Sequence, residues 1–498
     1  MQDTPRTPAG TPPHPEHFDF LIIGAGISGI GAARYLRQRF PNDSLAILET
    51  MDGYGGTWWT HRYPGARSDS DLYTYGYAFK PWKGNTIASA EEIRRYLGEA
   101  IEEGQLDARI RYGHQVTAAD WSSQEQRWTL QVTRLASGEQ FTVTAGFLWM
   151  CAGYYDHRKG HMPEWPGMQD FQGRTVHPQH WPEDLDYAGK RVVVIGSGAT
   201  AATLVPALAD QVAHITMLQR SPTFFASDPV EHPLEAPLRA LNLPDDWMHE
   251  IMRRAHIAKT EQVVRMSAAQ PDAIRTFLID QARAQLPQGF DVDKHFNPSY
   301  RPWQQRIAVI PDGDLFTAIR SGKASVVTDT IERFDATGIQ LTSGEHLDAD
   351  IIVTATGFNM LQFGGIPLRV DGVQVPLQQR ATYRGLMMEG IPNMAYLAGY
   401  FRFSWTLRVD LVCDLVCRMI EHMRAQGLAV VVPTPADIDM PREPWNDADN
   451  INAGYIMRAR EQMPRQGPEQ PWRHAMEYYE ERDVLPGVSP ADKTLRYG

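Results

Sequence analysis

A single run, FDFLIIGAGISG at residues 18–29, sets the architecture expected for this chain. Its apolar first half is typical of a buried parallel strand. The second half has the spacing GxGxxG. Gly24 permits a tight turn, Gly26 lets a pyrophosphate approach the backbone, and Gly29 lets the following helix pack on the strand. The run therefore predicts the strand, turn and helix of a dinucleotide-binding unit.

A second strand ends in an acid at the distance that such a unit requires. Residues 45–48 (LAIL) are followed by Glu49, 20 residues after Gly29. A carboxylate at this position accepts hydrogen bonds from the hydroxyls of an adenosine ribose. A glycine-rich turn without a ligand is the alternative, but the strands, the glycines and the acid together favour a nucleotide site.

The same pattern recurs in the middle of the chain. RVVVI at residues 191–195 predicts another buried strand, and a GxGxxA motif follows it. The residues of this motif that we assign to nucleotide binding are Gly196, Gly198, Thr200 and Ala201. We therefore expect an α/β fold with two Rossmann-like dinucleotide-binding domains.

The residues after the second strand of each unit distinguish the two. In the second unit, Arg220 and Ser221 stand where the first unit has Glu49. Arg binds a phosphate through parallel hydrogen bonds, whereas a carboxylate would repel it. The first unit thus suits FAD, with its free ribose 2′-hydroxyl, and the second suits NADPH, with its 2′-phosphate. A solvated surface charge is the alternative explanation of Arg220.

Two further apolar runs mark the expected crossings between the domains. They end in Gly153 and in Thr356-Gly357, and we assign the last two residues to cofactor binding. The residues from about 225 to 300 have helical patterns and no strand-like alternation. The predicted parts are a disordered tail (1–16), an FAD-binding domain (17–150 and 365–498), an NADPH-binding domain (155–225 and 301–362) and a helical insertion (226–300).

Composition limits the partners and the compartment. The chain of 498 residues has 48 Lys and Arg against 60 Asp and Glu, a net charge of -12, and no basic run that could track a nucleic acid. Its 3 cysteines are too few to stabilise so long a chain through disulfide bonds, which favours a reducing compartment. No apolar stretch is long enough to span a bilayer and no signal peptide is evident, so we expect a cytoplasmic protein. Cys413 and Cys417 are four residues apart, but two small buried residues explain them better than a metal or redox pair.

Two dinucleotide units in one chain would bring a flavin and a nicotinamide within hydride-transfer distance. Such an arrangement suits a disulfide reductase, an oxidase or a monooxygenase. A flavin disulfide reductase carries its redox cysteine pair in the FAD domain, and this chain has no cysteine before Cys151. The first of the three classes is therefore not expected.

The segment FQGRTVHPQHWP at residues 171–182 narrows the choice. It fits FxGxxxHxxxWP and resembles the fingerprint of type I Baeyer–Villiger monooxygenases, whereas related flavin-containing monooxygenases have Tyr or Phe in place of Trp-Pro. The defining residues here are Phe171, Gly173, His177, Trp181 and Pro182. The resemblance implies that His177 and Trp181 lie at the domain junction and orient the NADPH domain. No acid or cysteine at ligand spacing accompanies His177 and His180, so we expect no metal.

A second family pattern, GGTWWTHRYPGARSD at residues 55–69, contains Trp58 and ends at Asp69. On this resemblance we count both residues among those that bind the cofactor. The likeness covers nearly the whole chain after the tail. Residues 177–210 and 291–332 look most like the ethionamide-activating subgroup, which oxygenates ketones and the sulfur of thioamides.

The resemblance also implies a mechanism. NADPH reduces FAD, O2 adds to the reduced flavin, and a fixed cation keeps the resulting peroxide deprotonated for attack on a carbonyl. By resemblance that cation is Arg306, held by Asp69, although an ordinary interdomain ion pair is the alternative. The expected products are esters or lactones of hydrophobic ketones, with sulfoxidation as a side activity.

Two alternatives and one departure from the family remain at this stage. A flavin-containing monooxygenase that acts mainly on thioethers, thioamides or amines is the second hypothesis, and a redox-sensing flavoprotein without turnover is the third. Gln305 precedes Arg306 where many relatives have Lys. The resemblance therefore implies weaker discrimination against NADH.

Overall fold

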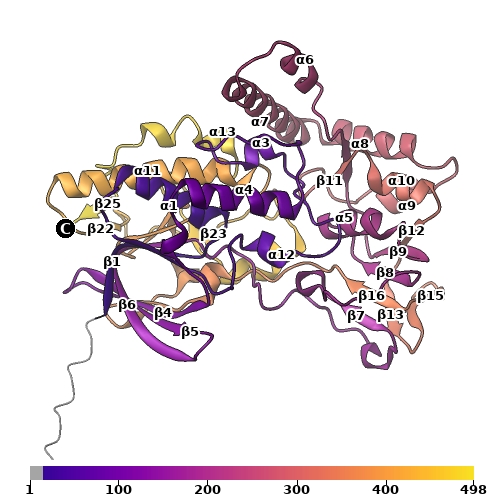
Figure 1. The fold of residues 1–498 in the computed structure, drawn as a ribbon, viewed down its shortest axis with the longest axis horizontal. Coiled ribbons are helices and arrows are strands. Elements are labelled where there is room, and N and C mark those ends of the chain that lie inside the picture. Colours follow the sequence, from indigo (N-terminus) through magenta and orange to yellow (C-terminus); the bar gives the residue numbers. More distant parts are fainter. Residues whose placement is uncertain (1–14) are drawn as a thin grey trace, which may run out of the picture.

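Two sheets, one in each half of the molecule, carry the two glycine motifs in the computed structural model, which describes residues 15–498 (Figure 1). The predicted α/β class is confirmed. Of the predicted tail, residues 1–14 lie outside the described residues. Glu16 already belongs to the first strand, β1 (Glu16–Ile23).

The larger sheet is built around β1. This strand pairs in parallel with β2 (Leu45–Leu48) on one side and with β6 (Glu139–Met150) on the other. The further strands of this sheet are β3 (Ile110–Arg111), β4 (His114–Ser122), β5 (Arg127–Arg134), β17 (Leu368–Val370), β18 (Val373–Gln374), β19 (Thr382–Tyr383), β20 (Met387–Met388) and β21 (Met394–Tyr396). Because β21 pairs in parallel with β6, the C-terminal part of the chain completes the sheet that the N-terminal part begins.

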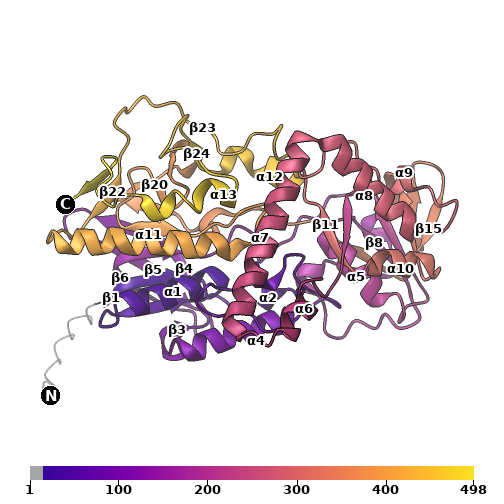
Figure 2. The same ribbon diagram turned by 90° about the horizontal axis from the view of Figure 1, so that it is seen from above.

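Helices cover one of the two apolar faces of this sheet. Helix α1 (Ile27–Arg39) starts at the first glycine motif and packs beside α11 (Trp405–Ala425), as Figure 2 shows. Cys413 and Cys417 on α11 are buried in the same core. The other helices in this half are α2 (Thr57–Thr60), α3 (Leu72–Tyr75), α4 (Ala90–Glu103), α12 (Gly454–Ala459) and α13 (Tyr478–Glu481).

The second sheet is fully parallel and carries the second glycine motif. Its strands, in spatial order, are β12 (Ala324–Thr328), β9 (His214–Gln219), β8 (Arg191–Ile195), β16 (Ile351–Thr354) and β7 (Arg174–Val176). Helices α5 (Ala199–Leu208) and α10 (Asp314–Arg320) pack together beside it. Smaller sheets are formed by β13 (Ile331–Phe334), β14 (Gly338–Leu341) and β15 (His346–Asp348), by β22 (Val431–Pro433) and β25 (Leu495–Tyr497), and by β23 (Glu443–Pro444) and β24 (Arg465–Gln466).

The stretch from about 225 to 300, which the sequence predicts to be helical, is mostly helical. It contains α6 (Glu235–Ala240), α7 (Asp245–Ala269), α8 (Pro271–Gln285) and α9 (Val292–Phe296). The expectation is wrong at its start, where Phe225–Asp228 form strand β10, paired in parallel with β11 (Ala308–Pro311). The partner strand lies some 80 residues further along the chain, so no local pattern signals this pairing.

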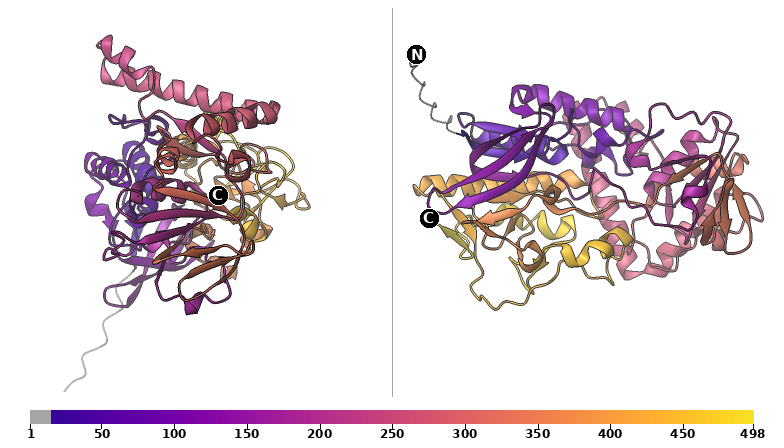
Figure 3. Two further views of the ribbon diagram at one scale, coloured as in Figure 1. Left: turned by 90° about the vertical axis from the view of Figure 1, so that its right-hand side faces the viewer. Right: turned by 90° about the horizontal axis from the view of Figure 1, so that it is seen from below.

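Helix α7 runs alongside both halves and is tied to the first (Figures 2 and 3). Its buried Arg253 donates to the carbonyl oxygens of Tyr73 at 2.8 Å and Gly76 at 3.0 Å, and forms an ion pair with Asp410 of α11 at 3.2 Å. Burial raises the pKa of Asp410 to about 6, and the charge of Arg253 opposes that rise. Among residues 15–498, no helix combines the length and apolar character that a membrane span needs.

Candidate active site at the junction of the two units

The backbone of the first glycine loop is tightly packed and leaves no room for a side chain at two positions. Gly24 has φ +102°, and a Cβ there would lie 2.6 Å from the carbonyl oxygen of Cys151. A Cβ on Gly29 would lie 1.9 Å from the carbonyl oxygen of Gly24. Both positions therefore require glycine, as the motif predicted, and they bring the N-terminus of α1 against the end of β1.

Glu49 closes the same loop from the end of β2. Its side chain is buried, and its two oxygens accept hydrogen bonds from the backbone N–H of Ala25 at 2.7 Å and of Met51 at 2.8 Å. Burial raises the pKa of Glu49, while these backbone donors act against the rise. A carboxylate has about four acceptor positions, so acceptor capacity remains for a hydroxyl of a ribose.

The Gly55-Gly56 turn covers the first loop. The N–H of Gly55 donates to the carbonyl oxygen of Ala25 at 2.9 Å, and a Cβ on Gly26 would lie 3.7 Å from the Cα of Gly56. Trp58 follows on α2 and donates through its indole N–H to the hydroxyl of Tyr75 at 2.8 Å. The second sequence pattern thus lies against the first glycine loop, with Trp58 packed between the cores of both halves.

The second glycine loop is more open. Gly196 has φ +124°, and a Cβ there would meet the carbonyl oxygen of Ala355 at 2.3 Å. Gly198, in contrast, is exposed and has no other atom within 4 Å of a Cβ position. Thr200 is half-buried, and Ala201, also on α5, is buried in the core of this half.

Arg220 and Ser221 are exposed at the end of β9. This strand neighbours β8, which leads into the second glycine loop, so both residues lie at the same edge of the sheet as the N-terminus of α5. Within residues 15–498 the guanidinium of Arg220 forms no ion pair. The two residues are therefore accessible to a phosphate that approaches the second loop.

The fingerprint residues pack at the edge of the second sheet. Phe171 is buried, and a Cβ on Gly173 would lie 2.3 Å from the carbonyl oxygen of Asp350. The ring of His177 accepts from the N–H of Gln179 at 3.2 Å, and a Cβ on Gly160 would lie 2.0 Å from this ring. Burial lowers the pKa of His177. These contacts are packing and hydrogen-bond contacts within the protein, and the orienting role of the fingerprint stays a prediction.

The remaining residues of the fingerprint and of the second crossing lie nearby. Trp181 and Pro182 are half-buried, and the ring of Trp181 packs near Tyr187. Thr356 donates through its hydroxyl to the carbonyl oxygen of His161. Gly357 has φ +100° and no other atom within 4 Å of a Cβ position. A narrow cavity at this point is lined by His61, Tyr63, His177, Pro178, Gln179, Thr200, Ala355, Gly357 and Phe358.

Arg306 and Asp69 meet where the two halves face each other. The guanidinium donates to both carboxylate oxygens, at 2.7 and 2.6 Å, and also approaches the carbonyl oxygen of Phe401 and the hydroxyl of Ser70, each at 3.4 Å. Desolvation lowers the pKa of Arg306, but the charge and hydrogen bonds of Asp69 raise it by more. The side chain of Arg306 is 44% exposed against 21% for Asp69. The carboxylate thus fixes a guanidinium that stays charged and accessible.

Aromatic residues surround this pair, and sequence reasoning missed most of them. The hydroxyl of Tyr154 donates to that of Tyr155 at 2.9 Å, and the ring of Tyr154 stacks on Trp405 at 5.1 Å. Trp405 in turn donates to the hydroxyl of Ser28 in the first turn of α1, at 2.7 Å. The position of Tyr154 and Tyr155, directly after the first crossing at Gly153, was the available signal.

Gln305 is bound to a C-terminal loop. Its amide donates to the side-chain oxygen of Asn452 at 3.1 Å, and the N–H of Asn452 donates to the carbonyl oxygen of Gln304 at 2.9 Å. Gln305 therefore anchors the segment before Arg306 to a C-terminal loop.

Both glycine loops fit a dinucleotide. Each lies at the start of a helix whose first N–H groups have no intrahelical partner, which is the arrangement that binds a pyrophosphate. The first loop adds the buried acceptor Glu49, and the second adds the exposed donor Arg220.

Comparisons with known proteins agree with this geometry. The model of the pyridine nucleotide-disulphide oxidoreductase family matches residues 18–272. The FAD-containing monooxygenase EthA of Mycolicibacterium smegmatis is 48% identical over 466 residues, which cover 93% of this chain and 94% of the relative.

Two solved structures show the same fold. An oxidized steroid monooxygenase bound to NADP superposes with a TM-score of 0.76 at 23% identity, covering 97% of this chain and 99% of the other. Cyclohexanone monooxygenase from Rhodococcus sp. Phi1, bound to NADP+, gives 0.74 at 21% identity, with the same coverage.

Proposed function

Because the chain belongs to the FAD-containing monooxygenases, within the pyridine nucleotide-disulphide oxidoreductase family, we propose that it is an NADPH-dependent Baeyer–Villiger monooxygenase. It would insert one oxygen atom of O2 next to the carbonyl of hydrophobic ketones and release the second as water. Esters or lactones would form at the expense of NADPH. Sulfoxidation of sulfides would be a side activity.

The observation that carries the proposal is the two-point contact between Arg306 and Asp69 at the junction of the two units. Bound FAD, once reduced, would supply the electrons that activate O2. Arg306 would present a permanent positive charge and N–H donors to the negative charge that develops on oxygen during attack on the carbonyl. Asp69 would hold the plane of the guanidinium, so that little reorganisation is needed during the reaction.

The chain offers residues to hold both cofactors. Gly24, Gly26, Gly29 and Glu49 would hold the adenosine and pyrophosphate of FAD, with Trp58 and Asp69 nearer its reactive end. Gly196, Gly198, Thr200, Ala201, Arg220, Ser221, Thr356 and Gly357 would hold NADPH. The first set suits a ligand without a 2′-phosphate because Glu49 would repel one, and the second suits a ligand with that group.

The deciding experiment is product analysis with the FAD-loaded enzyme and NADPH over linear, cyclic and aryl ketones plus one thioether. We expect esters or lactones from the ketones and a lower turnover of the thioether. The competing candidate, an enzyme that acts mainly on thioether, thioamide or amine heteroatoms, predicts sulfoxide without ester. The 48% identity to EthA does not separate the two candidates, because the name of that relative specifies no substrate class.

A further inference from the structure

The segment between α2 and Asp69 crosses from the first half of the molecule into the second. We call residues 61–67 the bridging segment. Its Tyr63, like Ala66, is buried in the core that surrounds α5 and α10. Burial raises the pKa of Tyr63 to about 12, while a hydrogen bond with Thr200 near the start of α5 opposes the rise. A piece of the first half is therefore built into the second half.

The bridging segment packs closely against α5. Gly65 has φ +74°, and a Cβ there would lie 2.6 Å from the Cβ of Ala207 and 3.2 Å from the carbonyl oxygen of Thr203. Both partners belong to α5, which begins directly after the second glycine loop. Only glycine permits so close an approach in this backbone conformation. The position of the bridging segment therefore depends on that of α5.

Arg67 adds an ion pair to this packing. Its guanidinium lies 2.6 Å from a carboxylate oxygen of Asp314, the first residue of α10, and the two side chains are 19% and 28% exposed. Helix α10 in turn packs beside α5. Arg67 thus connects the chain two residues before Asp69 to the second half of the molecule.

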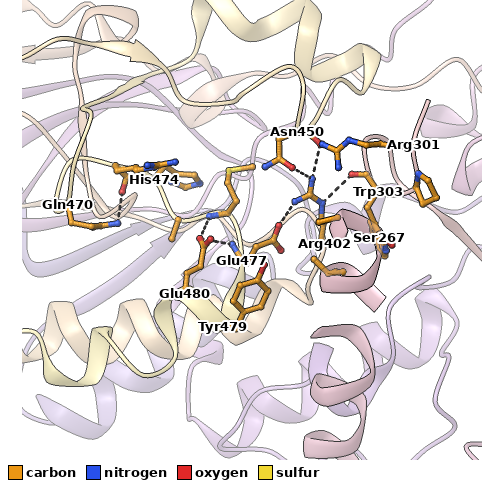
Figure 4. Close-up of a pocket in the computed structure, with 16 residues that line it drawn as sticks. Ser267, Arg301, Trp303, Arg402, Asn450, Gln470, His474, Glu477, Tyr479 and Glu480 are labelled. Carbon is orange, nitrogen blue, oxygen red and sulfur yellow. Dashed lines mark hydrogen bonds and ion pairs between the residues drawn. The ribbon is translucent and has the colours of Figure 1, made fainter. Parts of the chain in front are cut away.

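Arg306 is anchored in the opposite direction. It directly precedes the strand β11 of the second half, but the C-terminal part of the chain holds its loop. The buried Arg402, which is paired with Glu477, donates to the carbonyl oxygen of Trp303 at 3.2 Å (Figure 4). Arg306 and Asp69 therefore meet while each is also bound to the opposite half. Their contact depends on how the two halves are aligned.

We propose that Arg67 and Asp314 are positioning residues, which align Asp69 and its partner Arg306 with the second half of the molecule. This inference rests on the proposed function, because it concerns the cation assigned to oxygen transfer. Where the alignment is lost, NADPH, O2 and a proton give NADP+ and H2O2, and no oxygen reaches the substrate. The pair would therefore decide how much of the NADPH consumed yields oxygenated product.

The first test is a double-mutant cycle with Arg67→Ala, Asp314→Ala and the double variant. The measured quantity is the oxygenated product formed per NADPH oxidised by the FAD-loaded enzyme, with 2-octanone or, should no ester form, with methyl phenyl sulfide. We expect each single substitution to lower this ratio about threefold, the scale of a partly exposed ion pair, and the double variant to lower it no further.

The same cycle separates positioning from nucleotide binding. KM for NADPH should stay within about twofold of the parental value, because neither residue belongs to the second glycine loop. Losses that multiply in the double variant, or an unchanged ratio in either single variant, would overturn the proposal.

Two further variants show whether the ion pair itself is responsible. Arg67→Lys retains a cation opposite Asp314 and should keep the ratio within about twofold of the parental value. The matched control is Glu183→Ala, which removes the carboxylate of the other ion pair of the bridging segment, 3.3 Å from Arg62 and with a side chain 84% exposed. It should leave the ratio unchanged. A loss in Arg67→Lys or in Glu183→Ala as large as in Asp314→Ala would contradict the assignment.

Amide hydrogen exchange separates this inference from the proposed function, because it requires no oxygen transfer. The N–H of Ser68 donates to the carbonyl oxygen of Ala88 at 3.0 Å, so its exchange reports on the chain next to Arg67. In the FAD-loaded parent, saturating NADP+ should slow exchange of residues 66–71 about twofold, and in Asp314→Ala it should not. With that result the inference stands even if no ketone gives an ester, and only the proposed function fails. No effect of NADP+ in the parent, or an equal effect in Asp314→Ala, would overturn the inference.

Discussion

The two glycine loops share one motif and differ in how far the protein encloses them. Around the first loop, Glu49 is buried, the Gly55-Gly56 turn lies against the backbone, and Trp405 contacts the first turn of α1. Around the second, Gly198 is exposed and Arg220 lies free at the end of its strand. An enclosed loop suits a cofactor that stays bound, and an open loop suits one that exchanges in each cycle. We therefore expect the surroundings of the two loops, more than their shared motif, to decide which nucleotide stays bound and which exchanges.

The largest effect is expected at the cation between the two units. Arg306→Ala should slow ester formation a hundredfold to a thousandfold, about 2.7 to 4 kcal/mol, because a charged donor to the developing oxyanion is lost. Reduction of FAD by NADPH should continue, since both loops are intact. Stopped-flow absorbance for flavin reduction and chromatography for ester measure the two steps. Arg333→Ala, at an exposed position of β13, is the control and should leave both steps unchanged. Ester formation at the parental rate in Arg306→Ala would refute the assignment of Arg306 as the catalytic cation.

Arg220 tests the open loop. Arg220→Ala should weaken NADPH by about 1.5 to 3 kcal/mol, the usual contribution of a hydrogen bond to a charged group, and should hardly change NADH. Titration of each nucleotide against the FAD-loaded enzyme gives both dissociation constants. Equal losses for the two nucleotides would mean that Arg220 does not contact the 2′-phosphate.

A pair of glycine substitutions compares the loops directly. Gly29→Ala should lower the free energy of unfolding by about 1 to 3 kcal/mol and reduce the FAD content, because its Cβ would lie 1.9 Å from a backbone oxygen. Gly198→Ala meets no atom within 4 Å and should leave stability and FAD content unchanged while weakening NADPH. Denaturant unfolding and the flavin absorbance of the purified proteins measure these effects. Similar behaviour of both variants would remove the contrast between the loops.

The smallest effect concerns the pH dependence at Glu49. Burial raises the pKa of Glu49, so protonation in the folded state begins at a higher pH than in the unfolded chain. This difference stabilises the folded apoprotein at low pH, and the stabilisation is lost as the pH rises through the raised pKa. FAD affinity should change in the opposite direction and weaken by about 1 kcal/mol on acidification, since protonation removes a charged acceptor. Glu49→Gln should abolish the pH dependence of FAD release measured by fluorescence, and a persistent dependence would exclude Glu49 as its source.

The sequence predicts those parts of the molecule whose chemistry is local. Both glycine motifs and Glu49 were predicted correctly in position because turn, helix start and strand end follow each other along the chain. The contact between Arg306 and Asp69 followed only from family resemblance, since 237 residues separate the two. No local pattern indicates β10 or the stacking of Tyr154 on Trp405. Each depends on segments that meet only after the chain has folded.

The hydrogen bonds of Arg253 connect the helical insertion to α3 and to the residue that follows it. Arg253 holds the carbonyl oxygens of Tyr73 and Gly76, which follow Asp69 closely in the chain, and clasps Asp410 on the neighbouring helix. The insertion thereby fixes a segment that lies a few residues after Asp69, the carboxylate that binds Arg306. A loosening of these contacts would displace the segment that carries Asp69, although α7 itself contains no residue that we assign to either cofactor.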